Sequence, residues 1–498
     1  NTIHCLFPAL LERTDFVKAF TTPIVKAKRK TTRQTTRKTT RKTTGTQPHT
    51  NGGGIGDDEM VFYSLAKYDA WRVETFEGEA SSDTLSNWHI KYYKGLGTST
   101  AAEAREYFSA LEQHVIPYEW GGNNDGEKLD MAFRKSRSED RKKWLSRPLL
   151  AVPEDRTSNS AAAATTMEAF VDNELVLFSL ADNVRSIPSI IDGLKPSQRK
   201  VLYACFKRKL TNTEIKVAQL AGYVSEHTAY HHGEASLQST ITNMAQDFVG
   251  SNNIPLLYPS GQFGTRLQGG KDAASPRYIF TKLMKQSRMI FPVEDDPLLE
   301  YRDDDGYVVE PLHYVPIIPM ALVNGCDGIG TGWSTSIPMY NPLDLIEWIE
   351  DKIHKDGGGS GNGNGNGNGL QPWARGFTGS VSENPTKPGQ YTSTGIITQK
   401  NSNTLEITEL PIGRWTDDMK KVLSTLVSNN TIKGYREHHT EESVHFIVNM
   451  TRNKMMEISP HFEKVFKLEE KINTTNMHLF NAQGKRTVVC FGCLLGCF

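Results

Sequence analysis

Residues 226–278 read EHTAYHHGEASLQSTITNMAQDFVGSNNIPLLYPSGQFGTRLQGGKDAASPRY. His231 and His232 stand before a Gly-Glu pair that begins an expected helix, and a glycine-rich loop carrying Arg266 and Lys271 follows. The stretch ends in a Pro-Arg-Tyr sequence whose last residue is Tyr278. Phosphate groups bind well against glycine-rich backbone and cationic side chains, and an activated phenol oxygen can attack phosphorus. The stretch therefore indicates chemistry on a phosphate ester.

Three other blocks of the chain are equally distinctive: KYYKGLGTSTAAEAREYF (Lys91 to Phe108), SIPSIIDGLKPSQRKVLYACFKR (Ser186 to Arg208) and VPIIPMALVNGCDGIGTGWST (Val315 to Thr335). In this order, and together with the first stretch, they resemble the breakage-reunion core of the type IIA DNA topoisomerases of the eukaryotic kind (DNA topoisomerase II). With weaker flanking similarity, the resemblance covers most of residues 1–27, 60–355 and 370–485. Long blocks in the family's own order make the identification specific.

The resemblance implies an α/β multidomain fold with a partial TOPRIM α/β domain, a helical winged-helix domain and an α+β tower domain. A chain of 498 residues is long enough for two to four such domains. The predicted parts are a partial TOPRIM domain at 1–114 with a disordered basic insertion at 26–58, a connector at 115–165, a winged-helix breakage-reunion domain at 166–300, a tower domain at 301–475 with a Gly/Asn-rich insertion at 356–369, and a truncated, atypical tail at 476–498.

Composition limits how the chain can bind nucleic acid. Lys+Arg and Asp+Glu both number 57, so the formal net charge is +0, and DNA must be bound by local basic clusters. The six cysteines form no framework of paired spacings, which suits a reducing compartment. No apolar run reaches the roughly 18 residues that span a bilayer, so we expect no membrane partner.

Low-complexity segments interrupt the pattern. Residues 26–58 contain a basic Thr repeat followed by Gly and acid, a composition that cannot bury a core. We interpret this segment as a surface insertion, with a nuclear-import or DNA-contacting patch as the alternative.

After the last expected helix, the tail carries Cys490, Cys493 and Cys497. A second ligand pair is missing, so a zinc site is not predicted there, and the tail reads as a mistranslated or misassembled end.

A basic helix is predicted after residue 196, with Ser197 as its N-cap. Its apolar positions would face inward, and its opposite side carries Arg199, Lys200, Lys207 and Arg208. A helix, a turn and a basic helix are the outline of a helix-turn-helix or winged-helix DNA binder. On the pattern alone, an ordinary amphipathic surface helix is an equally good interpretation.

Two glycine-rich turns carry candidate DNA contacts. Lys94 lies in the sequence KGLGT and could help to cradle a phosphate, although such a turn alone is usually just a turn. Ile329 stands between glycines in NGCDGIGTGW. These glycines superficially match a nucleotide-binding fingerprint, but the strand-to-helix context and the downstream acid are missing. An apolar side chain on a glycine-supported loop can instead wedge between base pairs and bend DNA.

Matching the family's motifs assigns a role to each candidate. Tyr278 would attack a DNA phosphodiester and become joined to the 5′ phosphate of the broken strand. Arg277 would stabilise charge on the phosphate, and His232 would contact it. The remaining DNA-binding assignments are Arg185, Lys195, Arg199, Lys94, Lys271 and the intercalating Ile329. Taken without the resemblance, the tyrosine would be a surface aromatic, the histidine pair a helix cap or core group, and the isoleucine an inward-folded side chain.

The resemblance also implies cofactors and partners. The intact family enzyme uses Mg²⁺ and ATP, works as a homodimer on double-stranded DNA in the nucleus, and serves DNA topological change and chromosome segregation. The family's acidic metal ligands precede the segment at which this sequence starts, so no metal residue is assigned. The run Asp303, Asp304 and Asp305 reads as a loop.

The chain begins at Asn1, within what reads as an element, and we expect a fragment of a longer protein. Losing metal stabilisation of the attacking and leaving oxygens should cost several orders of magnitude in cleavage. We therefore expect this chain alone to bind DNA weakly and to cleave it poorly or not at all. Two functions remain: a piece of an ATP-dependent type II topoisomerase, or a catalytically inactive DNA-binding fragment.

Overall fold

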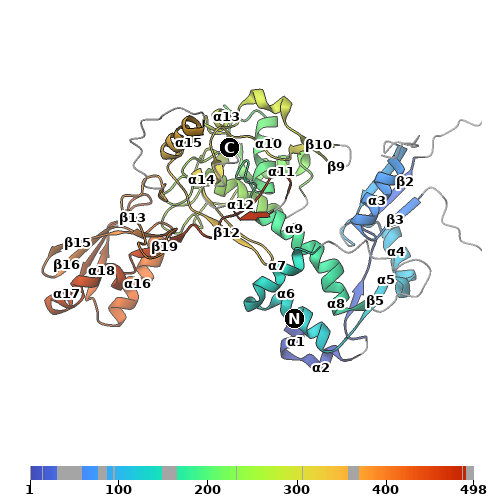
Figure 1. The fold of residues 1–498 in the computed structure, drawn as a ribbon, viewed down its shortest axis with the longest axis horizontal. Coiled ribbons are helices and arrows are strands. Elements are labelled where there is room, and N and C mark those ends of the chain that lie inside the picture. The colour runs from blue at the N-terminus through green and yellow to red at the C-terminus, as the bar shows by residue number, and fades with distance from the viewer. Residues whose placement is uncertain are drawn as a thin grey trace, which may run out of the picture. The chain divides into compact units, whose positions relative to one another are not determined.

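A computed structural model describes residues 2–13, 15–30, 59–76, 87–93, 96–147, 165–230, 233–304, 307–356, 370–484 and 486–488. The chain forms two compact units, Asn1–Ser179 and Leu180–Phe498, shown in Figure 1. No helix in the described residues combines the length and the apolar character that crossing a membrane requires.

A small antiparallel sheet and one helix make the first core of the N-terminal unit. The sheet has the order β3-β2-β4, and α3 packs on it. The bounds are β2 (Val25–Arg29), β3 (Glu59–Phe62), β4 (Trp88–Tyr92) and α3 (Leu65–Phe76). Because β2 pairs with a strand on each side, the ladder orders Lys26 to Arg29. The disordered insertion predicted at 26–58 therefore starts too early, and its residues 31–58 lie outside the described part of the chain.

The rest of this unit is mainly helical around a second sheet of order β1-β5-β6. The buried Asp125 carboxylate joins two of its helices, accepting hydrogen bonds from the backbone N–H of Gly121 at 2.8 Å and of Glu168 at 2.8 Å. The elements are α1 (Thr2–Leu6), α2 (Pro8–Leu11), β1 (Lys18–Phe20), α4 (Ala101–Ser109), α5 (Leu111–His114), β5 (Val115–Glu119), α6 (Asn123–Phe133), α7 (Ser138–Leu145), β6 (Thr165–Thr166) and α8 (Met167–Phe170).

Three helices form the main core of the C-terminal unit, and the apolar spacing of the sequence predicts the first and the third of them. They are α10 (Pro196–Lys207), α11 (Val217–His227) and α12 (Glu234–Ala245), which contact one another. The apolar residues predicted to face inward are buried: Val201, Leu202, Cys205 and Phe206 of α10, and Leu237, Ile241 and Met244 of α12. Phe248, predicted to share the face of the last three, is half-buried and lies beyond the end of α12 at Ala245. The N-cap of α10 is Lys195, two residues before the predicted Ser197, because Pro196 needs no partner for an N–H at the first helical position.

This core also collects later parts of the chain. Tyr314, Leu322 and Tyr340 belong to it, as do Met477 and Leu479 near the C-terminus. Residues 301–345 thus pack with the winged-helix region rather than with the predicted tower, and the predicted tail begins with core residues. The elements are α9 (Val176–Ser186), β7 (Ile215–Lys216), β8 (Phe280–Thr281), α13 (Ser287–Ile290), β9 (Tyr301–Asp304), β10 (Tyr307–Pro311), α14 (Met320–Val323), β11 (Cys326–Ile329), β12 (Ser334–Ile337), α15 (Pro342–Asp356), β20 (His478–Phe480) and β21 (Arg486–Val488).

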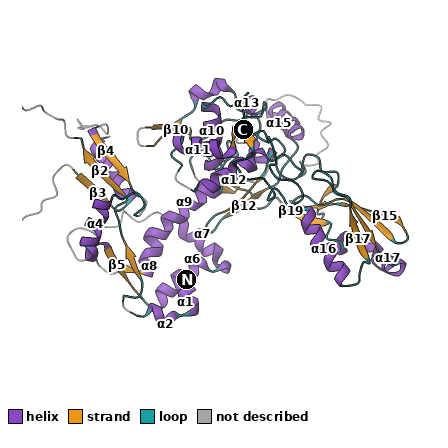
Figure 2. Ribbon diagram, turned by 180° about the vertical axis from the view of Figure 1, so that it is seen from behind, coloured by secondary structure: helices purple, strands orange, loops and turns teal. Residues whose placement is uncertain are grey.

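The last part of this unit, which we call the tower (residues 380–473), has a core of its own. Sheets of order β13-β14-β19 and β15-β16-β18-β17 carry helices on one side, with α16 beside β17 in Figure 2. Residues 469–473 (EEKIN), whose composition favours a helix, instead form a strand paired with β14. The elements are β13 (Ser380–Glu383), β14 (Gln390–Thr394), β15 (Ile396–Asn401), β16 (Thr404–Glu409), α16 (Thr416–Ser428), β17 (Gly434–Glu437), β18 (Phe446–Asn449), α17 (Arg452–Ile458), α18 (Phe462–Val465) and β19 (Glu469–Asn473).

Candidate nucleic-acid cleavage site

Tyr278 lies on the second arm of a long hairpin in the C-terminal unit. The two arms are residues 257–262 and 274–283. Ser260 and Phe280 exchange two backbone hydrogen bonds across them, with N–O distances of 3.1 and 2.9 Å. The glycine-rich loop connects these arms, so the tyrosine and the loop belong to one structural piece.

Backbone contacts with α11 hold the tyrosine's turn in place. Val217 donates its backbone N–H to the carbonyl of Ile279 at 3.0 Å, and Ala218 donates to the carbonyl of Pro276 at 3.1 Å. Ile279 is buried, whereas Tyr278 is 71% exposed. Tyr278 ends a turn, in which its backbone N–H donates to the Ser275 carbonyl oxygen at 2.9 Å. The turn and the buried Ile279 therefore hold the tyrosine on the solvent side.

A cation stands beside the tyrosine. The guanidinium carbon of Arg277 lies 5.9 Å from the ring centroid of Tyr278, and Arg277 is exposed. A group in that place can stabilise negative charge that develops on a phosphate next to the phenol oxygen. The third predicted catalytic residue, His232, lies outside the described residues.

A cavity of about 740 Å³ brings Arg185 close to the histidine segment. Tyr230, which immediately precedes the histidine pair, lines this cavity, as does Ser236 of α12. Arg185 also donates to Asp182 Oδ1 at 2.7 Å. The lining of the cavity carries both signs of charge, from Lys200, Arg302, Asp303, Asp304 and Glu310. Arg185 therefore lines the same cavity as the residue that precedes the histidine pair, and a DNA contact by Arg185 stays a prediction.

The glycine-rich loop (residues 263–273) closes on itself. The Asp272 carboxylate accepts hydrogen bonds from the backbone N–H of Thr265 at 2.9 Å and from its hydroxyl at 2.5 Å. Lys271 is exposed, as a phosphate contact requires. The other cation of the loop, Arg266, is buried and paired with Glu409 of β16. Of the two cations in the loop, only the lysine is available to DNA.

Ile329 lies at the end of β11, in a β-hairpin with β12 rather than in a loop. A Cβ on Gly328 would stand 2.2 Å from the Ser186 carbonyl oxygen, and one on Gly330 would stand 2.2 Å from Asn183 Oδ1. Both glycines thus press against α9. Ile329 between them points the other way, and its side chain is 84% exposed.

Polar contacts brace this hairpin from two helices. Lys195 Nζ donates to the Asp327 carbonyl oxygen at 2.7 Å. The Thr331 hydroxyl donates to Asp182 Oδ2 at 3.2 Å, and Asn183 Nδ2 donates to the Thr331 carbonyl oxygen at 3.2 Å. Sequence analysis missed the two α9 residues, because an Asp-Asn pair on a helix gives no signal of its partner 148 residues away. In this structure Lys195 supports the β11–β12 hairpin that carries Ile329, and a DNA contact by Lys195 stays a prediction.

The structure corrects the prediction for Arg199. Its side chain is buried, with the whole residue 6% exposed, and it donates to Asp192 through Nε at 2.6 Å and through Nη2 at 2.9 Å. Asp192 is fully buried and also accepts from the backbone N–H of Leu194 and of Tyr314, both at 3.0 Å. Burial by itself would lower the pKa of the Arg199 guanidinium, but the Asp192 charge outweighs burial and the pKa is raised. Arg199 therefore fixes the fold and is withdrawn as a DNA contact.

Replacing Asp192 by alanine should destabilise the protein by about 3–5 kcal/mol, because it leaves the Arg199 guanidinium buried without its counter-charge. The free energy of unfolding from urea titration measures this loss. The matched control is Asp418→Ala, which removes the exposed Asp418–Lys421 pair and should cost less than about 1 kcal/mol. Equal losses for the two variants would contradict a structural role for Asp192.

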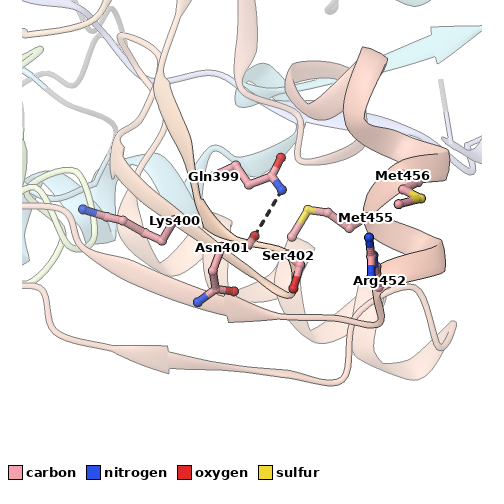
Figure 3. Close-up of a pocket in the computed structure, with 7 residues that line it drawn as sticks. All are labelled: Gln399, Lys400, Asn401, Ser402, Arg452, Met455 and Met456. Carbon is pink, nitrogen blue, oxygen red and sulfur yellow. Dashed lines mark hydrogen bonds between the residues drawn. The ribbon is translucent and has the colours of Figure 1, made fainter.

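The remaining predicted positions add no metal site. Lys94 lies outside the described residues. Within the described residues, no group of three or more His, Cys, Asp or Glu side chains could hold a metal ion. A second cavity of about 520 Å³ lies on the tower between the β15–β16 turn and α17 (Figure 3). Its Gln399 donates to the Asn401 carbonyl oxygen at 3.1 Å, and none of the predicted site residues lines it.

Comparison with known proteins now places the chain. Residues 185–493 match the family model of DNA gyrase/topoisomerase IV, in its A-type subunit. Residues 20–183 match the model of the C-terminal associated domain of TOPRIM. The chain therefore belongs to the type II DNA topoisomerase family, an enzyme family. The first matched range includes residues 476–493 of the predicted atypical tail. The second includes most of the predicted partial TOPRIM domain and all of the predicted connector.

Its relatives are eukaryotic. The mitochondrial DNA topoisomerase 2 of Dictyostelium discoideum is 46% identical over 477 residues, which are 95% of this chain and 33% of the relative. The DNA topoisomerase 2-alpha of Homo sapiens is 42% identical over 97% of this chain and 30% of the relative. A crystal structure of the Plasmodium falciparum topoisomerase II DNA-binding, cleavage and re-ligation domain matches with a TM-score of 0.73 and 42% identity, over 99% of this chain and 62% of that one. The chain spans about a third of the length of these curated relatives.

Proposed function

We propose that this chain is the breakage-reunion segment of an ATP-dependent type II DNA topoisomerase. The observation that carries the proposal is the presentation of Tyr278, which is 71% exposed beside Arg277 on a hairpin whose next residue is buried. The solved relative from Plasmodium falciparum is described as a DNA-binding, cleavage and re-ligation domain. An exposed nucleophile with an adjacent cation suits that chemistry.

In the proposed reaction, the Tyr278 phenol oxygen attacks the phosphorus of a DNA phosphodiester. A bond forms between that oxygen and phosphorus, and the bond from phosphorus to the 3′ oxygen of the neighbouring nucleotide breaks. The 3′ oxygen leaves and takes up a proton, while the phenol loses one. The strand is then joined through its 5′ phosphate to the protein, and attack by the 3′ hydroxyl reverses the step. Arg277 and His232 are the proposed phosphate contacts.

The proposed grip on DNA uses backbone contacts and one wedge. Arg185, Lys195, Lys271 and Lys94 would hold phosphates, which fixes the duplex without reading its sequence. Ile329 would enter between base pairs and bend the duplex. The close packing of its hairpin against α9 supports this role, because a side chain that separates stacked bases must be held rigidly.

The partners follow the same proposal. Two copies would cut the two strands, a second duplex would pass between them, and resealing would change DNA topology for chromosome segregation in the nucleus. We assign Mg²⁺ and ATP to the enzyme as a whole and to no residue of this chain. Because one relative is a mitochondrial enzyme, location in an organelle is the alternative to location in the nucleus.

A nicked duplex tests the function directly. The labelled strand carries the 5′ phosphate that becomes joined to the protein. The short fragment that ends in the new 3′ hydroxyl dissociates after cleavage, so the strand cannot be resealed and the adduct is trapped. Anisotropy of the same duplex measures binding before detergent denatures the protein. We expect a slowly accumulating label at the mass of the protein. Binding without any adduct would instead assign the chain to an inactive DNA-binding remnant, and absence of both would contradict either function.

A further inference from the structure

A buried ion pair joins the glycine-rich loop to the tower. The guanidinium of Arg266 binds the carboxylate of Glu409 and also donates to the Leu410 carbonyl oxygen at 3.3 Å. Glu409 accepts two more hydrogen bonds from Thr378, through the backbone N–H at 3.1 Å and the hydroxyl at 2.9 Å. The two charged side chains are 5% and 3% exposed, and 143 residues separate them in the sequence. The pair therefore connects two distant parts of the unit at one point.

The start of α16 makes a second connection to the same loop. The backbone N–H of Asp417 donates to the Leu267 carbonyl oxygen at 3.0 Å. The indole ring of Trp415 lies directly against Gly269, where a Cβ would be 2.3 Å from the ring. We call Arg266, Glu409, Thr378 and Trp415 the loop–tower joint. Together, the ion pair and the helix start hold the loop from two sides.

Few side chains set the shape of the loop from within. Gly264, Gly269 and Gly270 all have positive φ angles, of 95°, 64° and 81°, and glycine supplies no side chain to pack. The contacts within the loop centre on Thr265, which binds Asp272 and accepts at its carbonyl oxygen from the backbone N–H of Gly270 at 3.0 Å. From outside, the Gln246 amide at the end of α12 donates to two loop carbonyls at 3.0 and 3.3 Å. External attachment therefore decides where the loop stands, and with it the arm that carries Tyr278.

The joint lies between two cores that are each complete. The tower has its own cluster of buried residues, which includes Leu405, Phe446 and Leu468, and the three-helix core is separate. A buried ion pair adds little net stability compared with apolar packing, but it is directional. Its placement between two cores suits a connector that fixes relative position better than it suits a general stabiliser.

From this geometry we propose that Arg266 and Glu409 are positioning residues, through which the tower sets the position of the Tyr278 arm for DNA cleavage. The expected effect on DNA cleavage rests on the proposed function. The expected effect on the position of the Tyr278 arm rests on the loop–tower joint alone. Motion of the tower with bound DNA is transmitted through β16 to the loop and then to the tyrosine. Neither residue touches the phosphate.

The test uses Glu409→Gln, which keeps the shape of the side chain and removes its charge. Trapped adduct at saturating nicked duplex should form about 10- to 100-fold more slowly, because a small displacement of the nucleophile is enough for such a loss. The dissociation constant for DNA should not change. Arg266→Lys, which keeps the charge and loses the planar fork, should lose less than Arg266→Met. The matched control is Arg414→Gln, which breaks the Arg414–Glu470 pair elsewhere on the tower and should leave the rate unchanged.

Hydrogen exchange gives a readout that does not depend on cleavage. In Glu409→Gln, the backbone amides of Gly270 and Tyr278 should exchange about 10-fold faster, while the amides of β16 and β18 keep their wild-type rates. Thr378→Val removes one contact with Glu409 without unpairing a charge, and it should show the same effects more weakly. It is the variant to use if Glu409→Gln does not fold.

The two failures can be told apart. A wild-type chain that binds DNA and gives no adduct contradicts the proposed function, and the exchange data alone then decide the inference. Unchanged exchange at Gly270 and Tyr278 in both joint variants would overturn it, as would a wild-type cleavage rate in a folded Glu409→Gln chain. Faster exchange throughout the tower would show a merely structural role and would also overturn it.

Discussion

Replacing Tyr278 by phenylalanine is expected to abolish covalent capture of DNA, with the adduct reduced at least about 1,000-fold. The substitution removes a single oxygen atom, which is the proposed attacking atom. The side chain is exposed and packs little, so folding and DNA affinity should stay within about two-fold of wild type. Labelled adduct on a denaturing gel and anisotropy of the same duplex measure the two quantities together.

A matched exposed tyrosine provides the control. Tyr307 is 74% exposed on the β9–β10 hairpin of the same unit, outside the proposed site. Tyr307→Phe should capture DNA at the wild-type level. If Tyr278→Phe still formed adduct at the level of Tyr307→Phe, another residue would be the nucleophile and the assignment of Tyr278 would be wrong.

Replacing Ile329 by alanine should remove the bend in bound DNA while leaving the fold intact. Failure to bury an isoleucine side chain forfeits about 1.5–3 kcal/mol, so the bent complex should be about 10- to 100-fold less populated relative to the straight one. A duplex with 2-aminopurine at the wedge position reports base unstacking, and dyes at its ends report the bend by energy transfer. Loss of both signals is the expected result.

Ile317→Ala is the matched control for this experiment. Ile317 is also largely exposed in the same unit, and its backbone N–H is held by the Ile290 carbonyl oxygen rather than by the β11–β12 hairpin. It should unstack and bend DNA as the wild type does. A bend that survives Ile329→Ala would show that another side chain, or the basic contacts alone, deforms the duplex.

The sequence was sufficient to predict the family and two of the three core helices, α10 and α12, whereas α11 was not predicted. The assignment of Tyr278 as the nucleophile stays a prediction. The helical spacing of Leu237, Ile241 and Met244 places them on one buried face, as found. The Pro-Arg-Tyr turn after a glycine-rich loop was recognised through its resemblance. These features are local, since each depends on residues within one or two turns of chain.

Features that depend on tertiary pairing between side chains or strands were not predicted. Arg199 looked exposed on the helical pattern, but Asp192 from the preceding turn folds against it and buries both. Nothing local marks Arg266 for Glu409 rather than for DNA, and only the tower strand that comes much later supplies its partner. Likewise, the strand at residues 469–473 is set by pairing with β14, which overrides its helical composition.

The most direct test of the account is to identify the atom to which DNA becomes attached. Trapped adduct would be digested with nuclease and protease, and the remaining nucleotide-bearing peptide sequenced by mass spectrometry. The account predicts one peptide that spans Pro276 to Tyr278, with a nucleotide joined through its 5′ phosphate to the tyrosine oxygen. A nucleotide on any other residue, or one joined through a 3′ phosphate, would contradict it.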